Sequence, residues 1–358
     1  MNKGSAYNRS NRVTDLLGIK YPIIQGPFGG GFSTVDLVST ISNLGGLGSF
    51  GAHQLNAEEI QSLCKKIRKH TDNPFAINLW VSNSDDSMLS LTHSTFIEHR
   101  DAYSNFYNKL GATPPTWPEQ QSLTFEQQVE GVLRAKPRVF SFVFGIPSKE
   151  ILSECKHQDI LTLGAATTIE EASTLEEAEV DLILATGFEA GGHRPSFLKT
   201  AENSLIGNFA LIPAIRDAVK VPVIAGGGIA DRRGVRAALA LGADAVQVGS
   251  AFLASNESGA SKIHKTQLLN NTEGSTILSR AYSGRLARFI PNKITQYHSE
   301  SNLPTLPFPA QSWLTSPIKD AAIIKNDTES MPLYAGQIAP LLYHSSAKTV
   351  MDELFQGL

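Results

Sequence analysis

The sequence predicts an α/β protein of the (β/α)8 barrel class, known as the TIM barrel. Short apolar runs alternate with segments of helical character, which is the pattern of repeated βα units. The runs are continuously apolar, as expected for parallel strands that are buried on both faces. Glycine-rich turns follow the last three runs. The predicted strands cover residues 21–25, 46–50, 75–81, 139–144, 160–165, 182–185, 221–225 and 245–249.

Helix starts between these runs support the alternation. Asn56 precedes Glu58 and Glu59, and Thr168 precedes a similar acidic pair. Asn and Thr side chains accept hydrogen bonds from the first free backbone N–H groups of a helix, and acidic residues in the first turn suit the helix dipole. We therefore expect one helix to begin after Asn56 and another after Thr168.

Two stretches are longer than a barrel of this kind requires. Residues 82–121, with approximate bounds, follow the third predicted strand and contain Asp85-Asp86, several aromatic residues and Pro114-Pro115. They are expected to form a partly helical insertion. Residues 274–358 exceed an eighth helix and are rich in proline and aromatic residues, so they are expected to form a C-terminal extension over the barrel mouth. In this interpretation residues 1–358 form a single domain.

The composition excludes several classes of partner. The formal net charge is -3 and no basic run with interleaved aromatic residues occurs, so nucleic acid is not an expected partner. Residues 1–12 are polar and no run of about 18 apolar residues occurs, so we expect no membrane association and a cytoplasmic location. Cys64 and Cys155 lie far from any metal-ligand spacing, which predicts two reduced thiols and no metal site.

A histidine follows the sixth predicted strand on a glycine-rich turn. His193 closes the run Glu189-Ala190-Gly191-Gly192-His193, directly after the apolar residues 180–185. The carboxyl ends of the strands carry the chemistry of such barrels, so His193 is a candidate acid or base. The motif alone leaves open a second interpretation, in which the histidine only caps a loop.

Glycines also follow the seventh and eighth predicted strands. Gly226-Gly227-Gly228 and Gly249-Ser250 are placed where backbone N–H groups and a helix N-terminus can approach an anion. A phosphate site after strands seven and eight is a general property of the barrel, so the prediction is inherited from the fold. The alternative is that the glycines only tighten the turns. The spacing does not match the G-x-G-x-x-G dinucleotide fingerprint.

With these motifs in register, the chain resembles the nitronate monooxygenases, formerly called 2-nitropropane dioxygenases, and most closely their class I members. The resemblance runs over nearly the whole chain. The motifs that carry it lie at residues 21–27, 78–80, 189–194, 225–229, 242–249 and 334–337.

The resemblance implies FMN as cofactor and assigns residues to it. Gly26 and Pro27 are expected to lie against the isoalloxazine ring and Asn78 to hydrogen-bond the cofactor. Further expected cofactor contacts are Gly191, Gly192, Gly227, Gly228, Gln247, Gly249, Ser250, Gly336 and Gln337. His193 matches the family's active-site histidine, which takes the α-proton of a neutral nitroalkane. Such a base works best with a pKa near the operating pH, and we expect an imidazole to need little tuning for this.

The implied reaction is oxidative denitrification of an alkyl nitronate, such as propionate 3-nitronate, with O2. The nitronate gives one electron to FMN, and the products are a carbonyl compound and nitrite. Phe28 and Pro195 depart from the family's usual methionine and glycine, which leaves the preferred nitronate open. Arg194 either pairs with substrate charge or forms a salt bridge at the surface or within its loop. Tyr282, Ser283 and Arg285 either line the barrel mouth or form a solvated basic turn.

Two other functions remain open at this point. One is an NAD(P)H-dependent FMN reductase of the enoyl-acyl-carrier-protein reductase or quinone reductase type, which shares the Ala-Gly-Gly-His turn. The other is a non-redox barrel that binds a phosphorylated ligand. The expected partners are a small nitronate substrate and O2, and a homodimer is an open alternative to a monomer.

Overall fold

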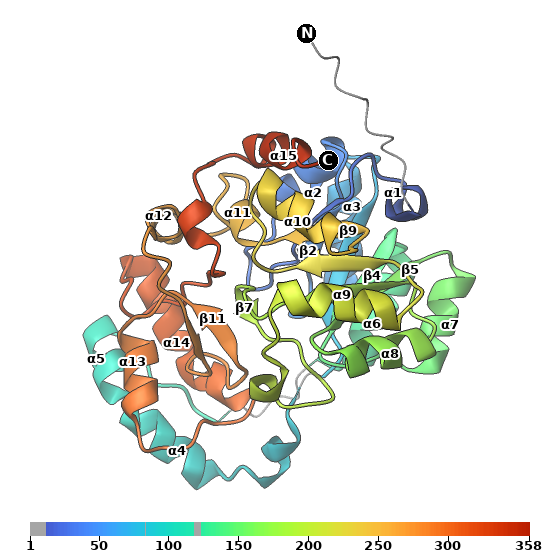
Figure 1. Cartoon of the computed structure of the whole chain (residues 1–358). Helices are drawn as coiled ribbons and strands as arrows, with labels where there is room; N and C mark the ends of the chain where they lie inside the picture. Colours follow the sequence, from blue (N-terminus) through green and yellow to red (C-terminus); the bar gives the residue numbers. More distant parts are fainter. Residues whose placement is uncertain (1–11, 83, 118–122) are drawn as a thin grey trace.

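The computed structural model describes residues 12–82, 84–117 and 123–358, and eight parallel strands form a closed barrel within them (Figure 1). The sheet runs in the order β1-β9-β8-β6-β5-β4-β3-β2, and a parallel bridge between Ile24 and Leu47 joins its two edges. Each strand coincides with a predicted run, so the predicted fold class is confirmed. The strands are β1 (Ile23–Gln25), β2 (Gly48–Gly51), β3 (Phe75–Trp80), β4 (Val139–Val143), β5 (Leu161–Ala166), β6 (Leu182–Thr186), β8 (Val223–Gly226) and β9 (Ala245–Val248).

A ring of helices covers the barrel. Asn56 caps α3 through a capping box with Glu59, and Thr168 caps α8 by accepting from the Glu171 N–H, so both predicted helix starts are confirmed. The ring consists of α2 (Val35–Asn43), α3 (Ala57–Arg68), α6 (Phe125–Ala135), α7 (Lys149–His157), α8 (Ile169–Glu177), α9 (Asn208–Ala218), α10 (Arg232–Ala240) and α15 (Ala347–Phe355).

The last helix corrects one expectation about the C-terminal extension. α15 packs against α2 and α10 and completes the ring, so the end of residues 274–358 belongs to the barrel wall and does not lie over the mouth (Figure 1). Val350, Met351 and Leu354 are fully buried in the same hydrophobic cluster as Val246 and Val248 of β9. The short helix that follows β9, α11 (Ser250–Leu253), is too small to cover that part of the sheet, and α15 takes its place.

The interior of the barrel is a packed core. Leu182, Leu184 and Ile224 belong to it together with Val13 and Leu17 of α1 (Arg12–Leu17). Alternate residues of a barrel strand point inward, which accounts for the pairing of Leu182 with Leu184. The first helix therefore closes the amino end of the barrel, and the carboxyl end is left for a site.

The insertion and the C-terminal segment form one body, here called the cap. Phe96 and Tyr107 from the insertion share a hydrophobic core with Tyr282, Leu314 and Ile318 from the C-terminal segment. The cap lies beside the barrel, at the lower left of Figure 1. Its elements are η1 (Asp86–Ser90), α4 (His93–Ala102), α5 (Ser104–Leu110), β10 (Ile277–Ser279), β11 (Ala287–Phe289), α13 (Lys293–Glu300) and α14 (Ala310–Lys325).

A small antiparallel sheet joins the cap to the barrel. β7 (Gly192–His193), in the turn after β6, pairs with β11, so that His193 lies opposite Ala287. β11 pairs in turn with β10. The histidine turn is therefore hydrogen-bonded into the cap. The remaining short helices are η2 (Ala201–Ser204), α12 (Lys262–Leu269) and η3 (Ala339–Leu341).

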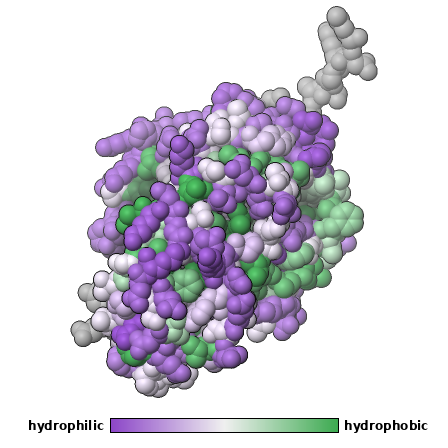
Figure 2. Space-filling view, turned by 90° about the vertical axis from the view of Figure 1, so that its left-hand side faces the viewer, coloured by the Kyte–Doolittle hydropathy of each residue, from purple (hydrophilic) through white to green (hydrophobic). Residues whose placement is uncertain are grey.

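The surface on the cap side is mainly hydrophilic, with hydrophobic residues gathered toward the right-hand edge of the view (Figure 2). Large apolar side chains that stay exposed include Leu89, Phe209 and Ile324. In the described part of the chain, no helix is long and apolar enough to cross a membrane.

Leu314→Ala tests the shared core of the cap. Leu314 of α14 is fully buried, so the truncation should lower the free energy of unfolding by about 2–5 kcal/mol. Ile324→Ala is the matched control, because that side chain on the same helix is 80% exposed and its loss should change the free energy by about 0.5 kcal/mol or less. Urea unfolding measures both, and equal losses would contradict a core common to the insertion and the C-terminal segment.

Candidate active site

His193 lies where the barrel meets the cap, beside aromatic side chains, and this cluster around the histidine is here called the recess. Its ring centroid is 5.0 Å from that of Trp80 at the end of β3, 6.4 Å from Phe144 after β4 and 5.9 Å from Tyr334 of the C-terminal segment. The residue His193 is partly accessible to solvent, although protein atoms surround its ring. Sequence reasoning therefore placed His193 correctly at the carboxyl end of the barrel.

A serine from the cap orients the imidazole. Ser283 Oγ lies 2.8 Å from His193 Nε2 and 3.2 Å from the carbonyl oxygen of Arg285. The carbonyl can only accept, so Ser283 Oγ donates either to it or to His193 Nε2, depending on the tautomer of the ring. In either direction, the hydrogen bond holds the imidazole in place.

The electrostatics of the recess keep His193 neutral. Burial lowers the pKa of His193 to about 3, and the positive charges of Arg285, His53 and Lys319 act in the same direction. The expectation of an imidazole with a pKa near the operating pH is therefore wrong for the protein by itself. A desolvated ring next to cations is neutral at every physiological pH, so one of its nitrogens keeps a lone pair.

A second histidine, His53, shares the recess, and sequence reasoning missed it. The His53 ring, two residues after β2, stacks on Trp80 at a centroid distance of 4.2 Å and an interplanar angle of 7°. Burial lowers the pKa of His53 to about 4, with a further contribution from Arg285. The available signal was position: His53, Trp80 and Phe144 each lie at or just beyond the carboxyl end of a predicted strand.

The turns after β8 and β9 have the backbone geometry of an anion site. Gly227 and Gly228 adopt φ angles of 98° and 70°, a region that favours glycine. Such turns present successive backbone N–H groups to one side. After β9, Gly249 is the N-cap of α11 and provides no side-chain cap, so the first N–H groups of α11 have no capping partner within the helix.

The C-terminal segment closes onto these turns. The Gly336 N–H donates to Ser250 Oγ at 2.9 Å, and the Gln337 N–H donates to the Glu189 carbonyl at 2.9 Å. A Cβ on Gly191 would lie 2.6 Å from the Gly336 nitrogen, so only glycine allows this close approach. The structure thus brings Gly191, Gly192, Gly227, Gly228, Gly249, Ser250, Gly336 and Gln337 to one side of the barrel mouth.

The remaining predicted residues lie on neighbouring strands. Gly26 and Pro27 follow β1, and a Cβ on Gly26 would lie 3.4 Å from the Gly249 Cα. Gln247 of β9 pairs with Ile24 on one side and with Gly226 on the other. Asn78 of β3 is buried, and its Nδ2 donates to Ser141 Oγ at 3.1 Å. These residues therefore lie on or directly after strands of the barrel wall.

Arg194 has a structural role that both earlier interpretations missed. Its guanidinium is buried and donates to the carbonyl oxygens of Thr186, Thr167 and Ser204 and, at 3.2 Å, to Ser204 Oγ. Burial lowers the pKa of Arg194 to about 10, and the group remains charged. The surface or intra-loop salt bridge is therefore wrong, and the substrate-pairing interpretation is wrong as well, because Arg194 ties the histidine turn to the loop before α9.

The segment 281–288 is not a solvated basic turn. Tyr282 is buried in the cap core, where its hydroxyl donates to the carbonyl oxygen of Met331 at 3.0 Å. Ser283 contacts His193, and Arg285 is buried among Trp80, Phe144 and Phe308. Ser283 therefore lines the recess, and Arg285 packs against the aromatic residues of its wall.

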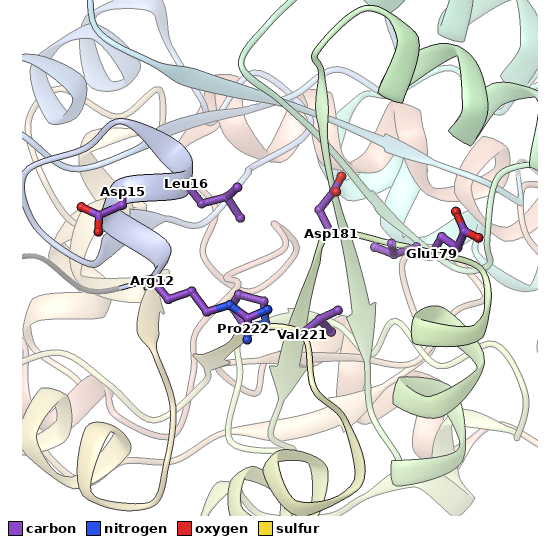
Figure 3. A pocket seen from close by; sticks show the side chains of 8 residues that line it. Arg12, Asp15, Leu16, Glu179, Asp181, Val221 and Pro222 are labelled. Carbon is purple, nitrogen blue, oxygen red and sulfur yellow. The ribbon is translucent and has the colours of Figure 1, made fainter.

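A surface cavity of about 560 Å³ lies at the opposite end of the barrel (Figure 3). It is lined by Arg12 and Leu16 of α1 and by residues at the amino ends of β6 and β8, among them Asp181 and Pro222. Conserved chemistry in such barrels is found at the carboxyl end, and His193 is not among the lining residues, so we assign the site to the recess. Within residues 12–82, 84–117 and 123–358, no group of three or more histidine, cysteine or acidic side chains could hold a metal ion.

Comparisons with known proteins agree with this geometry. A family model described as nitronate monooxygenase matches residues 10–357. A probable nitronate monooxygenase of Staphylococcus aureus (strain Newman) is 38% identical over 350 residues, with 97% of each sequence covered.

Two solved structures are similar over almost their whole length. A nitroalkane oxidase from Streptomyces ansochromogenes has a TM-score of 0.87 and 32% identity, with 97% of both chains covered. FabK from Thermotoga maritima has a TM-score of 0.75 and 25% identity, with 97% of this chain and 96% of that chain covered. The chain therefore belongs to the nitronate monooxygenase family, and it is an oxidoreductase.

Proposed function

We propose that the protein is an FMN-dependent nitronate monooxygenase that converts an alkyl nitronate and O2 to a carbonyl compound and nitrite. Membership of the family supports oxidation of a nitronate. The observation that carries the proposal is that His193 and the glycine turns after β8 and β9 all lie at the carboxyl end of one barrel.

The residues at the barrel mouth fit a flavin mononucleotide. The turn at Gly227 and Gly228 and the start of α11 offer backbone N–H groups to a single phosphate. Ser250 Oγ accepts from Gly336, so its own proton remains for a phosphate oxygen. Gly26, Pro27 and Asn78 would lie along the ring system, on the side of the mouth toward His193. The bound flavin would supply the electron acceptor that no side chain provides.

His193 would handle the proton when the substrate is a neutral nitroalkane. Ser283 holds the ring in place, and the unprotonated nitrogen of the neutral imidazole would accept the proton. Removal of the α-proton leaves a negative nitronate beside the new imidazolium, and this opposite charge raises the pKa of His193 while the pair exists. The walls of Trp80, Phe144 and Tyr334 limit access of water and strengthen that attraction. A nitronate offered as such needs no proton removal.

An NAD(P)H-dependent FMN reductase is the second candidate, because FabK shares the fold at 25% identity. The family match and the higher similarity to a nitroalkane oxidase favour the nitronate reaction. A non-redox barrel that only binds a phosphorylated ligand is disfavoured, because the family consists of oxidoreductases.

Stopped-flow absorbance and nitrite release distinguish these functions. We expect a yellow protein that, mixed with propionate 3-nitronate and O2, releases nitrite and consumes O2 in parallel. NADPH should leave the flavin absorbance unchanged on the same timescale. Rapid bleaching by NADPH without any reaction with the nitronate would instead identify the reductase.

His193→Asn tests the role of the imidazole as a base. Asparagine keeps a similar shape and cannot accept the proton, so kcat/KM for a neutral nitroalkane should fall by about 10²–10⁴-fold. Turnover of the preformed nitronate should remain close to that of the unchanged protein. Nitrite release from both substrates measures the two effects, and an equal loss on both would refute proton abstraction by His193.

The pH dependence of the same reaction follows from the lowered pKa of His193. The active form is the neutral ring, and a folded-state pKa of about 3 keeps it neutral well below the ordinary value of 6.5. The value of kcat/KM for a neutral nitroalkane should therefore stay level as the pH falls from about 8 to about 5. A pH profile measures this, and an inflection near 6.5 that disappears in His193→Asn would contradict it.

A further inference from the structure

Arg285 occupies a position that the proposed reaction does not explain. Its guanidinium carbon lies 4.2 Å from the ring centroid of Phe144, 4.3 Å from that of Phe308 and 5.4 Å from that of Trp80. The side chain is only 7% exposed. Two of these rings, Trp80 and Phe144, also contact His193. The cation therefore stands behind the aromatic wall of the recess.

The guanidinium holds the root of the insertion. Its Nε donates to Asp85 Oδ1 at 3.0 Å, and its two terminal nitrogens donate to the Ser82 carbonyl at 3.0 Å and to Ser82 Oγ at 3.1 Å. Ser82 and Asp85 are the first residues after β3, where the chain leaves the barrel for the cap. The planar fork of arginine suits three such acceptors, and a lysine ammonium could not reach them in the same geometry.

The same contact extends to the loop before α14. The second oxygen of Asp85 accepts from the Phe308 N–H at 3.0 Å, and the Asp85 N–H donates to the Phe308 carbonyl at 2.9 Å. Arg285 thus joins three segments that are far apart in the sequence. They are the end of β3, the turn between β10 and β11 in the cap, and the start of α14. All three contribute to the recess around His193.

We propose that Arg285 is a positioning residue that fixes the root of the insertion against the wall of the recess and imposes its positive charge on the two recess imidazoles. The relevance of this inference to catalysis rests on the proposed role of His193. Its test reads the imidazoles directly and does not depend on turnover, so its failure is distinguishable from failure of the proposed function.

The charged groups around the two imidazoles support the proposed effect of the Arg285 charge on them. The groups that act on His193 are Arg285 and Ser283 from the turn between β10 and β11, Lys319 from α14, His53 and Trp80 from the barrel and Tyr334 from the C-terminal segment. Arg285 lowers the pKa of His193 and also that of His53, second to burial in both cases. Asp85, 31% exposed, offsets only part of this charge because solvent also screens it.

The test combines three variants of the flavin-loaded protein with two measurements. Arg285→Met removes the charge and the fork, Arg285→Lys keeps the charge and removes the fork, and Asp85→Asn keeps Arg285 and removes its counter-charge. Nuclear magnetic resonance follows the titration of the His53 and His193 rings. Hydrogen exchange follows the backbone N–H groups of Asp85 and Phe308.

Arg285→Met should raise the pKa of His193 and of His53 by about one unit or more, because a nearby cation no longer opposes protonation. Arg285→Lys should leave both titrations near those of the unchanged protein. Both variants should accelerate exchange at the Phe308 N–H by about tenfold or more, because the fork no longer holds its acceptor Asp85. Asp85→Asn should shift both titrations in the opposite direction to Arg285→Met.

Arg138→Met is the matched control. Arg138 also joins distant segments, through the Leu16 carbonyl at 2.6 Å and Asp159 at 3.3 Å, but it lies at the amino end of the barrel. Its loss should alter neither titration. Unchanged titrations in Arg285→Met, or equal shifts in Arg138→Met, would overturn the proposal. If Arg285→Met fails to fold, Asp85→Asn decides, because a shift toward higher pKa in that variant contradicts the proposed sign.

Discussion

The antiparallel pairing of β7 with β11 is the interaction on which the site depends. It holds Gly192 and His193, which would otherwise belong to a free loop after β6, in register with Arg288 and Ala287 of the cap. The Arg194 N–H continues the pairing by donating to the Leu286 carbonyl at 2.9 Å. The barrel supplies Trp80 and Phe144 to the recess and the C-terminal segment supplies Ser283 and Tyr334. The surroundings of the histidine are therefore complete only where both parts of the chain are assembled.

Buried arginines fix the loops that meet where the barrel contacts the cap. Arg194 donates to loop carbonyls before α9, Arg285 donates to Ser82, and Arg288 donates to the Phe188 carbonyl at 2.7 Å. Burial of a charge costs free energy unless the group is hydrogen-bonded, and each guanidinium meets this condition with oxygen acceptors. Together with burial, the nearby charge of Arg285 keeps both recess histidines neutral.

The barrel could be predicted from the sequence because its signals are local. A buried parallel strand is continuously apolar, and Asn56 and Thr168 mark helix starts within four residues of chain. The cap could not be predicted in the same way. The contact between Phe96 and Leu314 joins residues more than 200 positions apart, and neither residue has a local pattern that identifies its partner. The position of α15 in the ring of helices was not predicted for a similar reason. Only because α11 is short does α15 pack against that part of the barrel.

In the candidate site, too, residues with a local sequence signal could be predicted, and residues whose role depends on distant contacts could not. The positions of His193 and of the glycine turns follow from their place after strands, so sequence reasoning found them. Arg194 and Arg285 both belong to motifs near the site, and only the three-dimensional acceptors reveal that each holds a loop. His53 was missed because a histidine after β2 carries no motif, and its importance depends on stacking with Trp80.

A crystal structure of the protein with FMN tests the central claim most directly. The account predicts the phosphate within hydrogen-bond reach of the backbone N–H groups of Gly228 and Ser250, with the ring system facing His193. A phosphate bound elsewhere, for example in the cavity beside Arg12 at the amino end of the barrel, would contradict it. So would a flavin ring remote from the imidazole.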